Sequence, residues 1–171
     1  MKLFSGRVFL LIAVLVTLHG CGFKFRGSQP LPEGIQQVYL ADPKEYSPLK
    51  RALKEHFDFY QIDYVANIPV AQKDQTIAIY LYPDSLDRRL LSLFSTGQVA
   101  EYELVLTIKL QVIFPNNEPQ IVEFDITREY QDDPDAILAK SRELDLILKE
   151  MRNQAADRIV RMLPSLDSRE H

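Results

Sequence analysis

The sequence predicts an α/β (α+β) two-layer sandwich, in which a mixed, mainly antiparallel sheet of about four strands carries two helices on one face. Residues 98–114 alternate apolar and polar side chains without a break, as a half-buried strand does. A second alternating stretch, Ile121–Tyr130, follows directly after a turn. Two further segments, which begin near Ser47 and Asp133, have apolar residues at helical spacing.

Residues 98–114 form the strand around which the other elements are expected to assemble. The even-numbered side chains from Ala100 to Phe114 are apolar, whereas most odd-numbered ones are polar, so one face is expected to be buried. At about 3.4 Å per residue such a strand spans nearly 60 Å, against the usual 5 to 6 residues. We therefore expect an elongated domain in which one end of this strand projects beyond its helical cover.

Three shorter stretches complete the expected sheet. The turn-rich run 115–119 returns the chain as a hairpin into Ile121–Tyr130, the partner of the long strand. Gln36–Leu40 is a short strand that Asp42 and Pro43 end, and Thr76–Tyr82 is another that Pro83 ends.

Both expected helices begin at a capping residue followed by proline. Ser47 precedes Pro48, and the first helix has Leu49, Leu53, His56, Phe57 and Tyr60 on one face. Asp133 precedes Pro134, and the second helix is expected to stop at 163–164. At 1.5 Å per residue its roughly thirty residues reach about 45 Å, enough to follow much of the long strand. Its apolar stripe comprises Ile137, Leu144, Leu148, Met151, Ala155, Ile159 and Met162.

The segment 84–97 has two interpretations. Arg88 and Arg89 run into four large apolar residues, Leu90, Leu91, Leu93 and Phe94. Such a patch could meet a ligand with both phosphates and acyl chains, because guanidinium groups suit phosphate and leucines suit hydrocarbon. The interpretation that the pattern favours is a strand at the sheet edge, with its leucines in the core and its arginines in solvent.

The first twenty residues have the layout of a secretory signal. Lys2 and Arg7 precede the apolar run 8–18, which is too short to span a bilayer. Leu18-His19-Gly20-Cys21 follows and resembles a bacterial lipobox, although His19 replaces the usual small residue. The alternative is an ordinary signal peptide with an incidental cysteine. We expect residues 1–20 to be the signal, 21–34 a lipidated tether, 35–164 one domain and 165–171 a polar tail.

Lipidation at Cys21 would keep the protein on its membrane, because two or more acyl chains anchor stably. Gly22 follows the cysteine instead of the aspartate that marks inner-membrane retention, which predicts an outer-membrane protein anchored on the periplasmic side. Loss of residues 1–20 removes two positive charges and changes the formal charge from −4 to −6. A chain this acidic is not expected to bind nucleic acid, and any anionic ligand needs a local basic cluster.

The sequence shows no set of residues typical of an enzyme. His56 is the one histidine within the expected domain, and on an apolar helical face it is expected to be structural. No Walker or dinucleotide-binding glycine pattern is present. Asp132, Asp133 and Asp135 are explained better by helix capping than by a metal site. We therefore expect no catalysis, no metal and no cofactor.

Several short motifs follow one another along the chain. They are Cys21-Gly22-Phe23 with Arg26-Gly27, Gly97-Gln98 with Glu101-Tyr102, Ala139-Lys140, Lys149-Glu150-Met151 and Leu163-Pro164-Ser165. In this order and spacing, over residues 21 to about 166, they resemble the LptE (RlpB) family of lipopolysaccharide-assembly lipoproteins. It implies a sheet of about four strands with two helices on one face, in a lipoprotein that plugs the LptD β-barrel, assists its assembly, binds lipopolysaccharide and helps deliver it to the cell surface.

The resemblance also implies binding residues. Lys140 matches a family lysine linked to lipopolysaccharide binding, whereas the family's second basic position matches Ser95 here. Arg88 and Arg89 lie a few residues before Ser95 and are hypothesised to compensate. The implied partners are thus an LptD-like barrel, lipopolysaccharide and the outer membrane. The alternative function is a periplasmic lipoprotein that activates a cell-wall synthase.

Overall fold

A computed structural model describes residues 31–44, 46–131 and 137–167, with the backbone alone described for 137–140. The predicted lipidation site, Cys21, and the predicted capping acids, Asp132, Asp133 and Asp135, lie outside these residues. The described chain contains two α-helices, α2 (Pro48–Phe59) and α3 (Ile137–Leu166), and one short 3-10 helix, η1 (Val70–Gln75).

One sheet of six strands accompanies the helices in the described part of the chain. Its strands are β1 (Gln37–Ala41), β2 (Asp63–Val65), β3 (Thr76–Leu81), β4 (Ser85–Leu93), β5 (Val99–Ile113) and β6 (Gln120–Gln131). The predicted mixed α+β class is confirmed, but the predicted number of about four strands is too low. The sequence analysis missed β2, because its three residues are too few to show alternation.

β5 is the strand on which the sheet is built. β6 pairs antiparallel with one edge of β5, from Glu101 to Val112. The other edge is shared, since β4 pairs with residues 99–107 and β3 with residues 110–113. β1 then joins β3 and β2 by parallel pairing. The sheet is therefore mixed and mainly antiparallel, as the sequence predicts.

The predicted start of α2 is confirmed. The Ser47 side chain accepts a hydrogen bond from the backbone N–H of Lys50 at 3.0 Å, and Pro48 occupies the first helical position. The helix ends where the N–H of Tyr60 donates to the carbonyl of His56 at 2.9 Å. Leu49 and Phe57 are buried on the inner face, so α2 is the cover helix that the apolar spacing indicates.

The predicted end of α3 is wrong by two residues. Pro164 lies inside the helix, which continues to Leu166. Pro164 has no N–H to bond to the carbonyl of Val160, and only two residues of the helix follow it. The Ser165 hydroxyl donates to the carbonyl of Met162 at 2.8 Å, which supplies another donor at this end.

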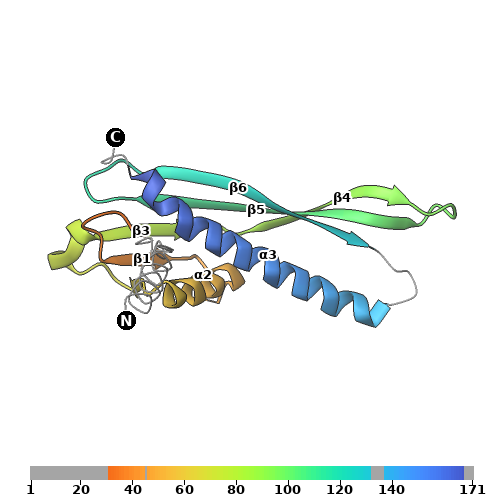
Figure 1. Ribbon diagram of the computed structural model, residues 1–171, viewed down its shortest axis with the longest axis horizontal. Coiled ribbons are helices and arrows are strands. Elements are labelled where there is room, and N and C mark those ends of the chain that lie inside the picture. Colours follow the sequence, from red (N-terminus) through yellow and green to blue (C-terminus); the bar gives the residue numbers. More distant parts are fainter. Residues whose placement is uncertain (1–30, 45, 132–136, 168–171) are drawn as a thin grey trace, which may run out of the picture.

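The core lies between the sheet and the two helices, at one end of an elongated molecule (Figure 1). The inner residues of β5 from Leu104 to Val112 are fully buried against α2 and the second half of α3. Figure 1 shows the closed end of the hairpin of β4 and β5, in green, reaching beyond β6 and both helices as a two-stranded ribbon. The prediction of a projecting strand end is confirmed, and that of a sandwich over the whole sheet is wrong for this ribbon.

No helix among the described residues is both long enough and apolar enough to cross a membrane.

Candidate functional site

The candidate site is the hairpin of β4 and β5, because the segment that the sequence analysis left open forms its first strand. Phe94 and Gln98 close the hairpin with a hydrogen bond from the Phe94 N–H to the Gln98 carbonyl at 2.8 Å. Gly97 adopts a φ of 83° in this turn, a left-handed conformation that glycine tolerates without strain. The sequence Ser95-Thr96-Gly97 therefore suits the turn that it forms.

Arg88 and Arg89 point to opposite faces of the sheet. Arg88 lies opposite Leu104, whose side chain is in the core, whereas Arg89 lies opposite Glu103 on the outer face. Alternation along a strand forces this separation. The structure therefore does not bring the two arginines together as one binding pair.

Arg89 already has a partner on the outer face. Its Nη1 lies 3.4 Å from Oε2 of Glu103, and 64% of the arginine side chain is exposed. An ion pair this exposed contributes little to stability, about 0–1 kcal/mol. Arg89 is therefore a solvated residue, as the favoured interpretation of the segment predicts.

Arg88 lies on the helix-facing side of the sheet, near aromatic residues of β5 and β6. Leu90, Tyr102 and Tyr130 are opposite one another on this same side in the three strands. Burial and the Glu143 carboxylate of α3 raise the pKa of the Tyr130 phenol, while the Arg88 guanidinium lowers it. Arg88 therefore presents its charge toward the beginning of α3, beside an apolar surface.

The apolar residues of this segment do not join the core. Leu90, Leu91, Leu93 and Phe94 are 54%, 48%, 55% and 46% exposed, so the prediction that the leucines are buried is wrong. Two irregularities in the register, between Leu90 and Ser92 and between Ser92 and Leu93, interrupt the pairing with β5 here. The closed end of the hairpin lies beyond both helices (Figure 1). We call these four residues the hairpin apolar patch.

The position of the family's second basic residue lies at a distance from the arginines. Ser95 is in the hairpin turn, and the four strand residues after Arg89 put about 14 Å between Arg89 and the end of β4 at 3.4 Å per residue. The backbone of Lys140 is in the first turn of α3. An arginine at position 88 or 89 therefore does not occupy the place of a basic residue at position 95.

The outer face of the sheet is largely polar, and neither α2 nor α3 covers it. Along β5 and β6, Glu103 lies opposite Glu129, and Thr107 opposite Asp125. The Thr107 hydroxyl donates to Asp125 at 2.7 Å, and Lys109 Nζ lies 3.0 Å from Glu123 Oε2. This face also carries Asp87 and Glu101, so acidic groups outnumber basic ones on it.

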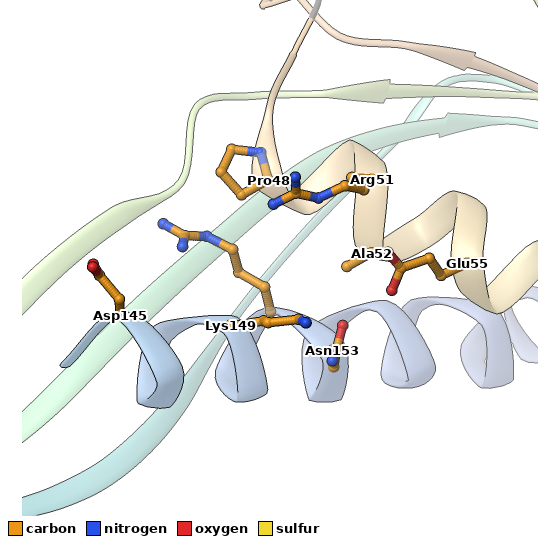
Figure 2. Close-up of a pocket in the computed structure, with 8 residues that line it drawn as sticks. Pro48, Arg51, Ala52, Glu55, Asp145, Lys149 and Asn153 are labelled. Carbon is orange, nitrogen blue, oxygen red and sulfur yellow. The ribbon is translucent and has the colours of Figure 1, made fainter. Parts of the chain in front are cut away.

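A second concave feature lies between the two helices. Figure 2 shows Arg51 of α2 with Asp145 and Lys149 of α3 around this hollow of about 200 Å³. Arg152 also lines it, with its Nε 2.8 Å from Oδ2 of Asp84. The hollow is lined by the residues Pro48, Arg51, Ala52, Glu55, Asp145, Lys149, Arg152 and Asn153. The hollow has two acidic residues and three cations in its lining, and Asp84 adds a third acidic group beside Arg152. The charges therefore balance, and the hollow favours neither anions nor cations.

His56 lies in the packed region, on α2. Its ring is stacked on Tyr60 with 6.4 Å between ring centroids, and Nδ1 is buried with no hydrogen-bond partner within the described chain. The Tyr60 hydroxyl donates to Asp157 of α3 at 3.0 Å. This packing agrees with the structural role predicted for His56. Among the residues that the structure describes, no three His, Cys, Asp or Glu side chains are grouped as metal ligands.

Comparisons with known proteins agree with this geometry. The family model "LptE: Lipopolysaccharide-assembly" matches residues 35–163. The LPS-assembly lipoprotein LptE of Pectobacterium atrosepticum is 34% identical over 94% of this chain and 87% of that protein. The protein of the same name from Yersinia enterocolitica is 34% identical over 89% of this chain and 72% of its own length.

Solved structures share the fold. The crystal structure of the rare lipoprotein B from Shewanella oneidensis is 40% identical, with a TM-score of 0.70 over 79% of this chain and 99% of that one. The solution structure of a lipoprotein B from Nitrosomonas europaea is 24% identical, with a TM-score of 0.65 over 88% and 97% of the two chains, and it shows the fold alone.

Fold and sequence together define an α+β lipoprotein with a projecting two-stranded ribbon. The chain belongs to the LptE family, which is involved in lipopolysaccharide assembly.

Proposed function

We propose that this chain is an outer-membrane lipoprotein, anchored through Cys21 on the periplasmic side, that plugs an LptD-like β-barrel and assists its assembly. Membership of the LptE family supports this proposal. The observation that carries it is the uncovered face of β5 and β6, which is long, polar and acidic. The lumen of an outer-membrane barrel is polar, so a plug with such a face can occupy it without burying apolar surface.

The test is copurification of the tagged, lipidated protein from outer membranes. A plug should elute with one equivalent of a large outer-membrane barrel and reduce the sensitivity of that barrel to protease. Mass spectrometry of the amino-terminal peptide should show an acylated Cys21. Elution with an inner-membrane enzyme instead would identify the activator of a cell-wall synthase and overturn the proposal.

The same function includes binding and delivery of lipopolysaccharide, for which Arg88, Arg89 and Lys140 are the candidate contacts. The hairpin apolar patch supports this role, since it exposes four large hydrophobic side chains within a few residues of Arg88. Arg88 is the stronger candidate of the two arginines, because Arg89 is in an ion pair with Glu103 on the other face. The backbone of Lys140 lies in the first turn of α3, the helix whose Glu143 acts on Tyr130 together with Arg88.

Separate substitutions distinguish these contacts. Arg88→Ala and Lys140→Ala should each weaken lipopolysaccharide binding several-fold, because each removes one charge-assisted contact to a phosphate. Arg89→Ala removes the same charge from the outer face and serves as the matched control, with binding unchanged. Equal losses for Arg88→Ala and Arg89→Ala would show that net charge, and not the helix-facing surface, governs binding.

A further inference from the structure

The first two turns of α2 present a cluster of positive charge in an acidic protein. Lys50, Arg51 and Lys54 line two neighbouring hollows, of about 250 and 400 Å³, together with Tyr46 and Tyr64. None of the three cations forms an ion pair within the described part of the chain. We call these five residues the α2 basic patch. The sequence analysis did not single out its cations.

The stability of α2 does not explain this arrangement. The amino-terminal end of a helix is electropositive, so cations are favoured in the last turn and anions in the first. α2 has the opposite order, with no acidic residue in its first turn, Lys50 and Arg51 near its start, and Asp58 near its end. The charges oppose the helix dipole, which indicates that they serve an external anionic partner.

The tyrosines of the patch suit a membrane interface. Tyr46 is 89% exposed, and Lys54 Nζ lies 5.2 Å from the centroid of the Tyr64 ring. Tyrosine places an apolar ring and a polar hydroxyl at the boundary between hydrocarbon and water, and lysine stems extend their charges past such rings. One acidic residue, Asp42, also lines the larger hollow, where it accepts a hydrogen bond from the Lys44 N–H at 2.7 Å.

The patch lies in the half of the molecule where the described chain begins (Figure 1). Leu31 packs against the core just before β1, and Tyr39 in the middle of β1 lines the larger hollow. β1 has five residues and therefore spans about 17 Å. The ten residues from Cys21 to Leu31 reach at most about 35 Å when extended. A tether of this length lets the patch reach the bilayer that holds Cys21, whereas the closed end of the hairpin lies at the opposite end of the molecule.

We propose that the α2 basic patch docks on the anionic phospholipid headgroups of the bilayer that holds the protein. The inference rests on the membrane anchor of the proposed function. A chain with a formal charge of −4 is repelled by an anionic surface, so a local basic cluster decides which side approaches it. Docking through α2 would fix the orientation of the domain and direct the hairpin away from the membrane.

The test uses the chain that begins at Gly22, which lacks the anchoring cysteine and keeps every residue of the core cluster. It should sediment with phosphatidylcholine vesicles that contain half phosphatidylglycerol, and not with pure phosphatidylcholine vesicles. Each cation near an anionic surface contributes about fivefold to partitioning, so Lys50→Gln with Lys54→Gln should weaken binding about 25-fold. Binding should also fall in 1 M salt, where the Debye length shrinks to about 3 Å.

Lys73→Gln with Lys109→Gln is the matched control, because it changes the net charge equally at two exposed lysines outside the patch. Its binding should equal that of the unsubstituted chain. Equal weakening of both double variants, or no binding to the anionic vesicles, would overturn the proposal. Competition by inorganic phosphate beyond that of sodium chloride at matched ionic strength would assign the patch to free phosphate and overturn it too. Because the test chain has no anchor, these results do not depend on whether Cys21 is acylated.

Discussion

The two ends of β5 have the same alternating sequence and different surroundings. From Leu104 onward the even-numbered side chains are buried beneath α2 and α3, and Leu106, Ile108 and Leu110 are 0% exposed. Near the start of the strand, Tyr102 is only partly buried, and the paired strand β4 lies at the edge of the sheet. A period of two residues therefore shows which face is apolar, but a covering helix is needed to bury it.

α3 shows the same division along its length. Met151, Ala155 and Ile159 are 0% exposed where α2 lies beside the helix. Toward its beginning Leu144 and Leu148 are partly covered, and Leu146 is 68% exposed. The packed half of the molecule supplies stability, while the half with the ribbon keeps apolar surface available for a ligand or partner.

The largest expected difference between the two halves comes from truncating one leucine in each. Leu106→Ala should lower the free energy of unfolding by about 2–5 kcal/mol, because it leaves a cavity in the packed half. Leu90→Ala should change it by no more than about 0.5 kcal/mol, because the side chain is already half in water. Urea unfolding followed by circular dichroism measures both values.

If Leu106→Ala does not fold, Ile108→Val offers a milder probe of the same region, with an expected loss of about 0.5–1.5 kcal/mol. Similar losses for Leu90→Ala and the core variant would mean that the ribbon is packed in solution and that the comparison is wrong.

A smaller effect is expected from the ion pair that joins the two halves. Asp84, between β3 and β4, pairs with Arg152 of α3, and the two side chains are 18% and 20% exposed. Asp84→Asn should lower the free energy of unfolding by about 1–3 kcal/mol, because it leaves a largely covered guanidinium with a weaker partner.

Glu103→Gln is the control for this ion pair, since it weakens the exposed pair with Arg89. Its effect should stay below about 0.5 kcal/mol. A loss at Glu103 as large as that at Asp84 would contradict the distinction between covered and exposed pairs.

The smallest expected effect concerns the hydrogen bond between α2 and α3. Tyr60→Phe should lower the free energy of unfolding by about 1 kcal/mol at pH 7, because it removes the bond from the Tyr60 hydroxyl to Asp157. Tyr82→Phe, at a 41% exposed position, is the control and should have almost no effect.

This contribution should also depend on pH. The hydrogen bond to Asp157 is the main cause that raises the pKa of Tyr60 above its usual 10, and burial adds to it. Folding therefore favours the protonated phenol. Its contribution to the free energy of unfolding is complete below pH 10 and is lost as the pH rises through the raised pKa. A constant difference between Tyr60→Phe and the unsubstituted chain up to pH 11 would contradict this assignment.

Particular residues show how far the sequence predicted the site. Ser47 and Pro48 marked the start of α2 to the residue, and alternation identified β5 and β6 within one or two residues, because these signals are local. Arg88 and Arg89 were correctly placed at a sheet edge. That they face opposite sides follows from alternation alone, and applying the two-residue period to this segment would have separated them.

The α2 basic patch could not be recognised in the same way. Lys50, Arg51 and Lys54 are an ordinary polar helix face in the sequence, and Tyr64 comes from a strand too short to predict. Only folding places the tyrosine beside these lysines. The order of charge along the helix was the one signal that could have drawn attention to them.

By itself, the sequence determined the long helices and strands, the apolar face of each and the family, because periodicity, capping and short motifs are properties of neighbouring residues. The tertiary structure alone decided which apolar faces are covered. Burial depends on the length and position of a second element, and α2 is too short to follow α3 and β5 to their far ends. Leu90 and the core leucines of β5 therefore lie on the same face of the sheet and differ only in what covers them.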